Sequence, residues 1–173
     1  DENMANAARV HAVENGEDLS EYTMIAFGGA APLHAGRLCE KLGVDRLLVP
    51  TGAGVGSAIG FLRAPFSFEA NRSVYMKLSD FKPDLIKSLL TELQDEATGF
   101  VRSCDATSGI ISEFKVYMRY TGQGWEIPIS LTAEQALTPD ANTFLELFEA
   151  DYSGLFGRTV DGMDVEITVW SVN

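Results

Sequence analysis

Residues 22–32 read Tyr-Thr-Met-Ile-Ala-Phe-Gly-Gly-Ala-Ala-Pro, a short apolar run followed by a glycine turn. An apolar run of this length, closed by glycines, is typical of a buried strand. Gly28 and Gly29 allow the backbone to turn tightly. Pro32 suits the first turn of a helix, because its missing N–H has no hydrogen bond to lose there. The segment therefore predicts a strand, a tight turn and a helix in succession.

The same alternation continues on both sides of this segment. An alanine-rich helix is expected before it, over residues 3–15, and the helix after the turn is expected to end near Leu42. A second buried strand is expected over residues 46–49, and a helix of small residues from Ser57 to about Arg63. Helices and strands that alternate with short connections predict parallel strands in an α/β layer.

The composition of the sequence changes near Pro65. Residues 1–65 carry 5 basic and 8 acidic side chains and 9 of the 16 glycines, whereas residues 66–173 carry 8 basic and 17 acidic side chains. Pro65 would also end the preceding helix. We therefore expect one domain over residues 1–65 and a second over residues 66–173.

The second part shows a different order of elements and is expected to be a small α+β domain. Residues 114–120 and 125–131 alternate apolar and polar side chains around a turn with two glycines, which predicts a β-hairpin. Pro128 lacks an amide donor, so its strand is expected at a sheet edge or at a bulge. Four other elements are expected: a strand within Phe68–Leu78, a long helix from Pro83, a helix with Thr138 as N-cap and Pro139 in its first turn, and a last strand over Asp164–Val172.

The charge balance excludes several kinds of partner. The protein has 173 residues and a formal net charge of −12, whereas nucleic acids and anionic membranes bind clustered Lys and Arg. Its apolar runs are far shorter than the ~20 residues of a membrane span. Two cysteines, Cys39 and Cys104, are too few for a disulfide framework. We expect a cytoplasmic protein without a nucleic-acid or membrane partner. Because Asp1 is not a translation start, we also expect it to derive from a longer polypeptide.

The glycine turn after the first strand is a candidate nucleotide site. Glycines let a ligand approach the backbone closely, and the N-terminus of the following helix offers free N–H groups and partial positive charge. A tight turn in which any side chain would clash explains the same glycines equally well. His34, in the first turn of the helix, can either face a ligand at the turn or lie on the helix surface.

The second glycine-rich segment, residues 52–60, resembles a dinucleotide-binding fingerprint only poorly, because Ser57 stands where the last glycine belongs. A close packing contact that requires small residues explains it better. The sequence has no phosphate-binding loop of the Gly-Lys-Ser/Thr type and no metal site with zinc spacing. In the hairpin, Arg119, Gln123 and Glu126 can form a polar cluster or simply pair across the strands.

Five segments taken in order carry a resemblance to a known family: residues 2–11, residues 27–35, residues 49–50 with 54–60, residues 118–126 and residues 148–157. Together they resemble the hydantoinase/oxoprolinase family, and within it the A-type subunits. This family contains ATP-dependent N-methylhydantoinase, 5-oxoprolinase and the related acetone and acetophenone carboxylase subunits. The resemblance extends over essentially all 173 residues.

The resemblance implies a fold and a cofactor. It implies that residues 1–65 are the C-terminal part of an actin-like, ribonuclease H-like ATPase layer, followed by the α+β domain. It implies ATP with Mg as cofactor, with the phosphate and metal motifs upstream of these residues. The residues at the adenosine motif would then be Gly28, Gly29, Ala30, Pro32 and His34. Ala31 departs from the family pattern, which has glycine there.

The resemblance also implies an activity. Such enzymes open a lactam or hydantoin ring after phosphorylating its carbonyl oxygen, while the carboxylases use ATP to activate bicarbonate or an enolate. We therefore expect the C-terminal fragment of an ATP-dependent cyclic-amide hydrolase, inactive by itself, with no catalytic residue assigned. Two alternatives remain open: a fragment of a ketone carboxylase subunit, and a non-catalytic assembly domain. The expected partners are a small cyclic amide or ketone and a second, B-type subunit or another copy of the protein.

Overall fold

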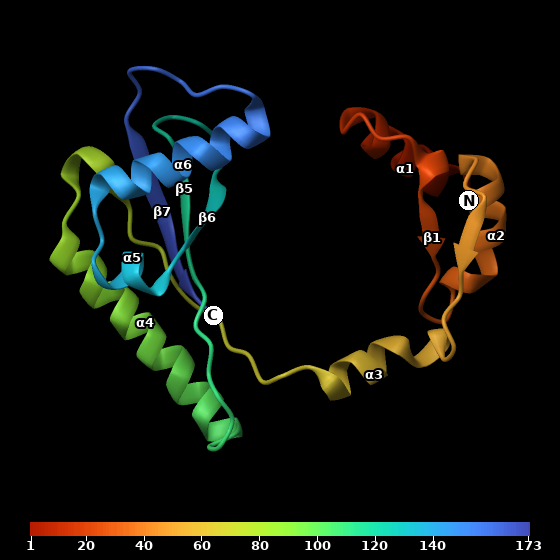
Figure 1. Cartoon of the computed structure of the whole chain (residues 1–173), viewed down its shortest axis with the longest axis horizontal. Coiled ribbons are helices and arrows are strands. Elements are labelled where there is room, and N and C mark those ends of the chain that lie inside the picture. The colour runs from red at the N-terminus through yellow and green to blue at the C-terminus, as the bar shows by residue number, and fades with distance from the viewer. The chain divides into compact units, whose positions relative to one another are not determined.

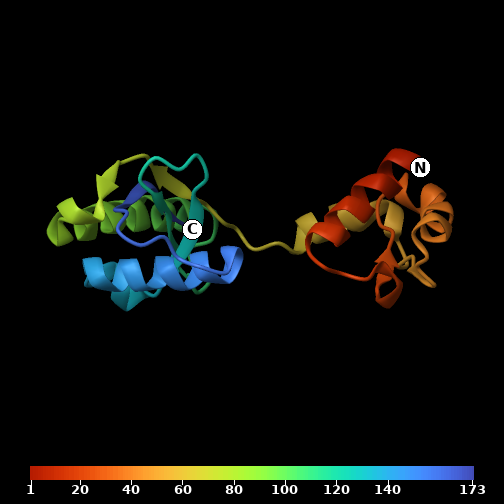
Figure 2. The same cartoon turned by 90° about the horizontal axis from the view of Figure 1, so that it is seen from above.

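The computed structural model describes all residues from Asp1 to Asn173. The protein forms two compact units, unit 1 over Asp1–Pro65 and unit 2 over Phe66–Asn173, which Figures 1 and 2 show from two directions. Both units mix helices and strands, so the fold is of the mixed α/β type. None of the helices combines the length and the apolar character needed to cross a bilayer.

Unit 1 alternates helices with two short strands, as the sequence predicts. Its main elements are α1 (Glu2–Glu14), β1 (Thr23–Ile25), α2 (Ala31–Leu42), β2 (Arg46–Leu48) and α3 (Gly56–Arg63), with 3-10 turns at Leu19–Glu21 and Ala53–Val55. Strands β1 and β2 are parallel, and Met24 pairs with Leu47. Gly43, at φ +69°, ends α2 in the left-handed conformation that favours glycine.

The two faces of the β1–β2 pair have different surroundings. On one face Met24 contacts α2, where its sulfur lies 3.5 Å from the thiol of Cys39. On the other face Ile25 and Leu48, which are partners in the register, are 64% and 52% exposed. The expectation of two buried strands is therefore wrong for this face, because no element of the unit covers it.

Unit 2 is built on a five-stranded antiparallel sheet in the order β3-β7-β5-β6, with β4 also paired to β7. Its elements are β3 (Ala70–Arg72), β4 (Met76–Lys77), a 3-10 turn (Leu78–Asp80), α4 (Pro83–Cys104), β5 (Phe114–Tyr120), β6 (Ile127–Leu131), α5 (Ala133–Leu137), α6 (Ala141–Phe156) and β7 (Val165–Val172). The hairpin β5–β6 is observed, and β6 pairs only with β5, so Pro128 lies at the sheet edge as predicted.

Three details of unit 2 differ from the sequence prediction. The strand expected within 68–78 is two short strands, β3 and β4. Helix α6 is capped by Asp140, whose carboxylate accepts from the amide of Thr143, and not by Thr138. Helix α5 was not expected, although Thr132 and Gln135 form a capping box at its start.

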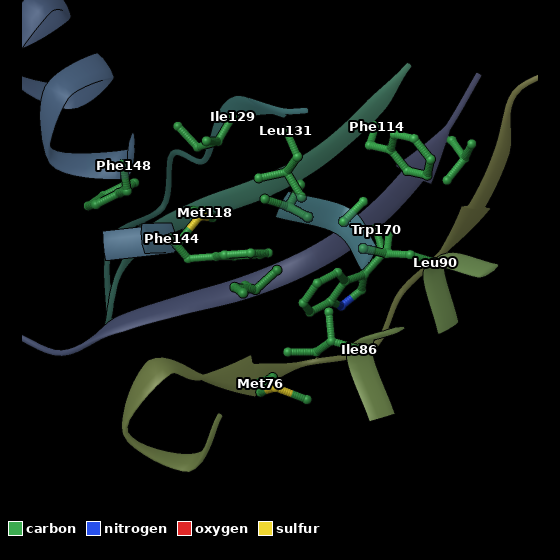
Figure 3. Close-up of a cluster of buried hydrophobic side chains, with 14 of the residues drawn as sticks. Met76, Ile86, Leu90, Phe114, Met118, Ile129, Leu131, Phe144, Phe148 and Trp170 are labelled. Carbon is green, nitrogen blue, oxygen red and sulfur yellow. The ribbon is translucent and has the colours of Figure 1, made fainter. Parts of the chain in front are cut away.

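All three helices of unit 2 contribute to one core on one face of the sheet. The core joins Ile86 and Leu90 of α4 to Phe144 and Phe148 of α6, with Trp170 from β7 between them (Figure 3). Because side chains alternate along a strand, the intervening residues of β4, β5 and β7 point to the opposite face. This helix-free face carries Lys77, Lys115, Tyr117, Arg119, Glu166 and Ser171.

Candidate functional site

The candidate site lies where the two parallel strands of unit 1 end. Because the strands are parallel, the loops after β1 and β2 leave the same edge of the sheet. The amide of Ala26 donates to the carbonyl of Leu48 (2.9 Å), and the amide of Gly28 donates to the carbonyl of Ala53 (2.8 Å). These two bonds bring the two glycine-rich segments together at one edge.

The backbone at this edge is open on the side of the first glycine segment. Gly28 has φ +100°, a conformation that other residues rarely adopt. A Cβ built on Gly28 or on Gly29 would have no neighbour within 4 Å. Crowding within the unit therefore does not explain Gly29, and the space beside both residues is available to a ligand.

The second glycine segment has a packing role. A Cβ on Gly56, the first residue of α3, would lie 2.8 Å from the ring of Phe27. A side chain at this position would require that ring, which lies shortly after β1 in the sequence, to move. This contact supports the interpretation that the segment requires small residues for packing.

The helix after the first glycine segment begins without a side-chain cap. Ala30 is the N-cap of α2, Ala31 is the first helical residue and Pro32 the second. Ala30 has no polar side-chain atom, so part of the N-terminal N–H groups of α2 lacks an intrahelical or side-chain acceptor. The residues expected at an adenosine site, Gly28, Gly29, Ala30 and Pro32, thus belong to one continuous segment at this end of the sheet.

His34 lies in the first turn of α2, and its ring contacts the beginning of α1. Its Nδ1 is 3.2 Å from Oδ1 of Asp1, and the side chain is half exposed. The structure therefore gives His34 a partner within unit 1.

Unit 1 and unit 2 offer no cluster of metal ligands. No group of three or more His, Cys, Asp or Glu side chains is close enough to hold a metal ion.

The three polar residues of the hairpin do not form one cluster. Nε of Arg119 donates to Oε1 of Glu166 (2.7 Å), Gln123 donates to the hydroxyl of Tyr152 (3.0 Å), and the hydroxyl of Thr168 donates to Glu126. Glu166 was not predicted, because its partner is 47 residues away in the sequence. The available signal was an acidic residue between the apolar residues Val165 and Ile167.

Glu166 is the most buried charged group of unit 2, with 3% of its surface exposed. The hydroxyl of Tyr75 donates to its Oε2 (2.7 Å). Burial alone would raise the pKa of the Glu166 carboxyl. The hydrogen bonds from Tyr75 and Arg119 lower this pKa by more than burial raises it, so the pKa in the folded protein lies below its ordinary value. The hydrogen bond between Tyr75 and Glu166 also raises the pKa of the Tyr75 hydroxyl.

Comparison with known sequences identifies similar proteins. Residues 1–70 match the sequence model of the hydantoinase/oxoprolinase family. An uncharacterized protein of Methanocaldococcus jannaschii is 32% identical over 131 residues, which are 76% of this chain and 19% of that protein. Caprolactamase subunit alpha of Pseudomonas jessenii is 25% identical over 169 residues, 95% of this chain and 24% of that subunit.

Two solved structures have a similar fold. The ATP-dependent caprolactamase of Pseudomonas jessenii superposes with a TM-score of 0.68 at 22% identity, over 98% of this chain and 25% of that chain. Nucleotide-free acetone carboxylase superposes with a TM-score of 0.65 at 21% identity, over 99% of this chain and 26% of that chain. These two structures therefore share the mixed α/β fold of this protein. Residues 1–70 belong to the hydantoinase/oxoprolinase family by the match to its model, and nearly the whole chain is similar to caprolactamase subunit alpha. The chain spans about a fifth to a quarter of the length of these relatives.

Proposed function

We propose that this protein is part of an ATP-dependent amidohydrolase that opens a lactam or hydantoin ring, and that unit 1 forms one wall of its adenosine site. The relatives that support this activity are the caprolactamase subunit and 5-oxoprolinases of Pestalotiopsis fici and Dictyostelium discoideum. Both names describe the hydrolysis of a cyclic amide. The actin-like architecture of the ATPase layer is part of the same proposal.

The observation that carries the proposal is the open backbone after β1. At Gly28 and Gly29 nothing in the unit lies within 4 Å of a built Cβ, so a flat base and ribose can lie directly against the backbone. Ala30 and Pro32 continue this segment into the uncapped N-terminus of α2, and His34 lies in the first turn of the same helix. A nucleoside held by backbone atoms would need such an accessible backbone beside a helix N-terminus, and this supports the proposal.

The proposed role of these residues is binding and orientation. Bound ATP would supply the phosphoryl group that converts the unreactive amide oxygen into a leaving group. Because catalysis of phosphoryl transfer is largely positioning and charge neutralisation, a wall that fixes the adenosine also fixes where the terminal phosphate lies. None of the side chains is assigned as the acid or base.

The first test measures nucleotide binding to the natural polypeptide that contains these residues. Gly29→Val places a branched side chain where the base and ribose would lie, and we expect at least a tenfold weaker ATP affinity by calorimetry, or about 1.4 kcal/mol. Gly36→Val, in the same unit on the exposed side of α2, is the matched control and should bind ATP like the parent. If Gly29→Val bound ATP with unchanged affinity, the adenosine site would lie elsewhere. The isolated 173-residue chain should bind ATP weakly, since we place the phosphate motifs outside it.

The second test identifies the substrate class. ATP hydrolysis by the natural polypeptide that depends on caprolactam, 5-oxoproline or a hydantoin would support the amidohydrolase. Dependence on a ketone together with bicarbonate would select the alternative function, a ketone carboxylase, which the similarity to the beta subunit of acetone carboxylase of Xanthobacter autotrophicus favours. ATP hydrolysis that responds to neither class of compound would favour the assembly role.

A partner subunit is also part of the proposal. The caprolactamase and acetone carboxylase relatives are both described as subunits, so we infer that a second type of subunit binds the protein. Residues 66–173 carry 8 basic and 17 acidic side chains, and unit 2 is the proposed contact. Co-purification of a second subunit, lost when acidic residues of unit 2 are neutralised, is the expected result.

A further inference from the structure

The helix-free face of unit 2 carries a row of three charged residues on neighbouring strands. Glu166 of β7 is flanked in register by Lys77 of β4 and by Arg119 of β5. The carboxylate between the two cations is buried, although it lies on the face that no helix covers. The row therefore has a net positive charge in a protein whose overall charge is −12.

Glu166 fixes the orientation of Arg119 but accepts a hydrogen bond from only one of the guanidinium nitrogens. The guanidinium contacts Oε1 through Nε alone, at 2.7 Å, and its two terminal nitrogens make no hydrogen bond in the structure. The side chain of Arg119 is 29% exposed, so a ligand can reach it. A guanidinium presents its donors as a planar fork that matches a carboxylate or phosphate.

Lys77 lies beside this fork and makes no ion pair. Both oxygens of Glu166 have other partners, since Oε1 accepts from Arg119 and Oε2 accepts from the hydroxyl of Tyr75. The ammonium group of Lys77, on the strand next to Glu166, is therefore available to a ligand on this face.

A purely structural role explains this arrangement poorly. Burying an ion pair costs desolvation energy, and an apolar pair of similar size would often stabilise a sheet equally well. An arginine that is held through Nε by a buried carboxylate is instead preorganised for binding. Its side chain is already ordered in the free protein, so ligand binding loses less conformational entropy. We propose that Arg119 and Lys77 bind a small oxyanion, a carboxylate or phosphate group, with Glu166 as the positioning residue.

The test is a titration of the 15N-labelled 173-residue chain, followed by NMR of the arginine Nε–H signals and the backbone amides. Inorganic phosphate and acetate are added separately at pH 7 and constant ionic strength. We expect saturable shifts at Arg119 and in residues 75–77 and 165–167. Saturation by phosphate alone would assign a phosphate-bearing ligand, and saturation by acetate alone a carboxylate. If neither anion gave saturable shifts in these residues, the proposal would be overturned.

Variants separate this site from general attraction of anions. Arg119→Lys keeps the charge but loses the fork, and we expect binding weaker by about tenfold. Lys77→Gln, at an edge strand and without an ion pair, should weaken binding without affecting the fold. Lys115→Gln, on the same face of β5, is the matched control and should leave the titration unchanged. Equal effects of Lys77→Gln and Lys115→Gln would contradict the site. This inference does not depend on the nucleotide site of unit 1.

Discussion

The two units of the protein differ in the size of the side chains that they bury. Unit 2 buries Trp170, Tyr120, Phe144 and Phe148 almost completely. Unit 1 buries only small side chains, namely Ala5, Ala12, Ala26, Ala35, Cys39, Val44 and Ala53. Because hydrophobic stabilisation grows with the apolar area removed from water, unit 2 supplies its own stability and unit 1 much less of it.

The strands show the same difference. Strand β7 lies between neighbours on both sides, and its side chains are largely buried. Strands β1 and β2 pair only with each other, and all three residues of β2 are exposed. Parallel strands are usually covered on both faces. The proposed nucleotide site is thus built on the less stable part of the molecule, where local opening requires the least free energy.

The largest expected effect compares the two tryptophans. Trp170→Ala removes a fully buried side chain whose indole N–H donates to the carbonyl of Val74 (2.8 Å). We expect the free energy of unfolding of unit 2 to fall by about 3–5 kcal/mol in urea denaturation followed by circular dichroism. Trp125→Ala is the matched control, because Trp125 is 74% exposed, and its effect should stay within about 0.5 kcal/mol. Similar losses in both variants would show that unit 2 does not depend on this core.

The next effect compares the two sheets within one experiment. In hydrogen exchange of the unmodified protein, amides of β5 and β7 should exchange at least about 100-fold more slowly than the amide of Ala26, which donates to Leu48. The reason is that β5 and β7 open only with the core of unit 2. Equal protection in both sheets would mean that unit 1 is as stable as unit 2 despite its exposed strands.

Local sequence patterns were sufficient to predict some of these elements. The hairpin β5–β6 follows from strict alternation around a glycine turn, and α4 follows from Pro83 and a continuous apolar stripe. Both signals operate within about 20 residues, over which periodicity is informative. The connection between β1 and α2 likewise follows from local composition, because two glycines after an apolar run allow the backbone to turn and Pro32 suits the first turn of a helix.

Contacts between distant residues could not be predicted in the same way. Glu166 pairs with Arg119 and with Tyr75, and neither partner follows from local spacing. The ring of His34 lies at Asp1, at the other end of the first helix–strand–helix segment. The exposure of Ile25 also contradicts the prediction that its apolar strand is buried. An apolar pattern shows which side chains can be buried, but it does not show whether a neighbouring element covers them.

A smaller effect tests how closely the glycine segments pack in unit 1. Gly56→Ala places a Cβ 2.8 Å from the ring of Phe27. Because this ring is 53% exposed and can shift toward solvent, we expect a cost of about 1 kcal/mol, at the low end for overpacking. Exchange of the Gly28 amide, which donates to Ala53, should accelerate accordingly. Gly60→Ala, in the same helix, places a Cβ that has no atom within 4 Å. This variant should slow exchange of the Gly28 amide slightly, because alanine favours the helix. Acceleration in both variants would indicate a general intolerance of α3 and not a clash with Phe27.

The smallest effect concerns the carboxylate of Glu166 and acid. Its pKa is lowered in the folded state from an ordinary value of 4.5, so its contribution to stability is complete above that value and is lost as the pH falls through the lower, folded-state pKa. The urea midpoint of unit 2 should therefore fall between about pH 5 and pH 3. Glu166→Gln removes the titrating group and should give a shallower pH dependence in this window. Glu149→Gln, on α6 and without a hydrogen bond or ion pair in the structure, should retain the parent's slope. An unchanged slope in Glu166→Gln would mean that other carboxylates cause the acid sensitivity of unit 2, and that folding does not lower the pKa of Glu166.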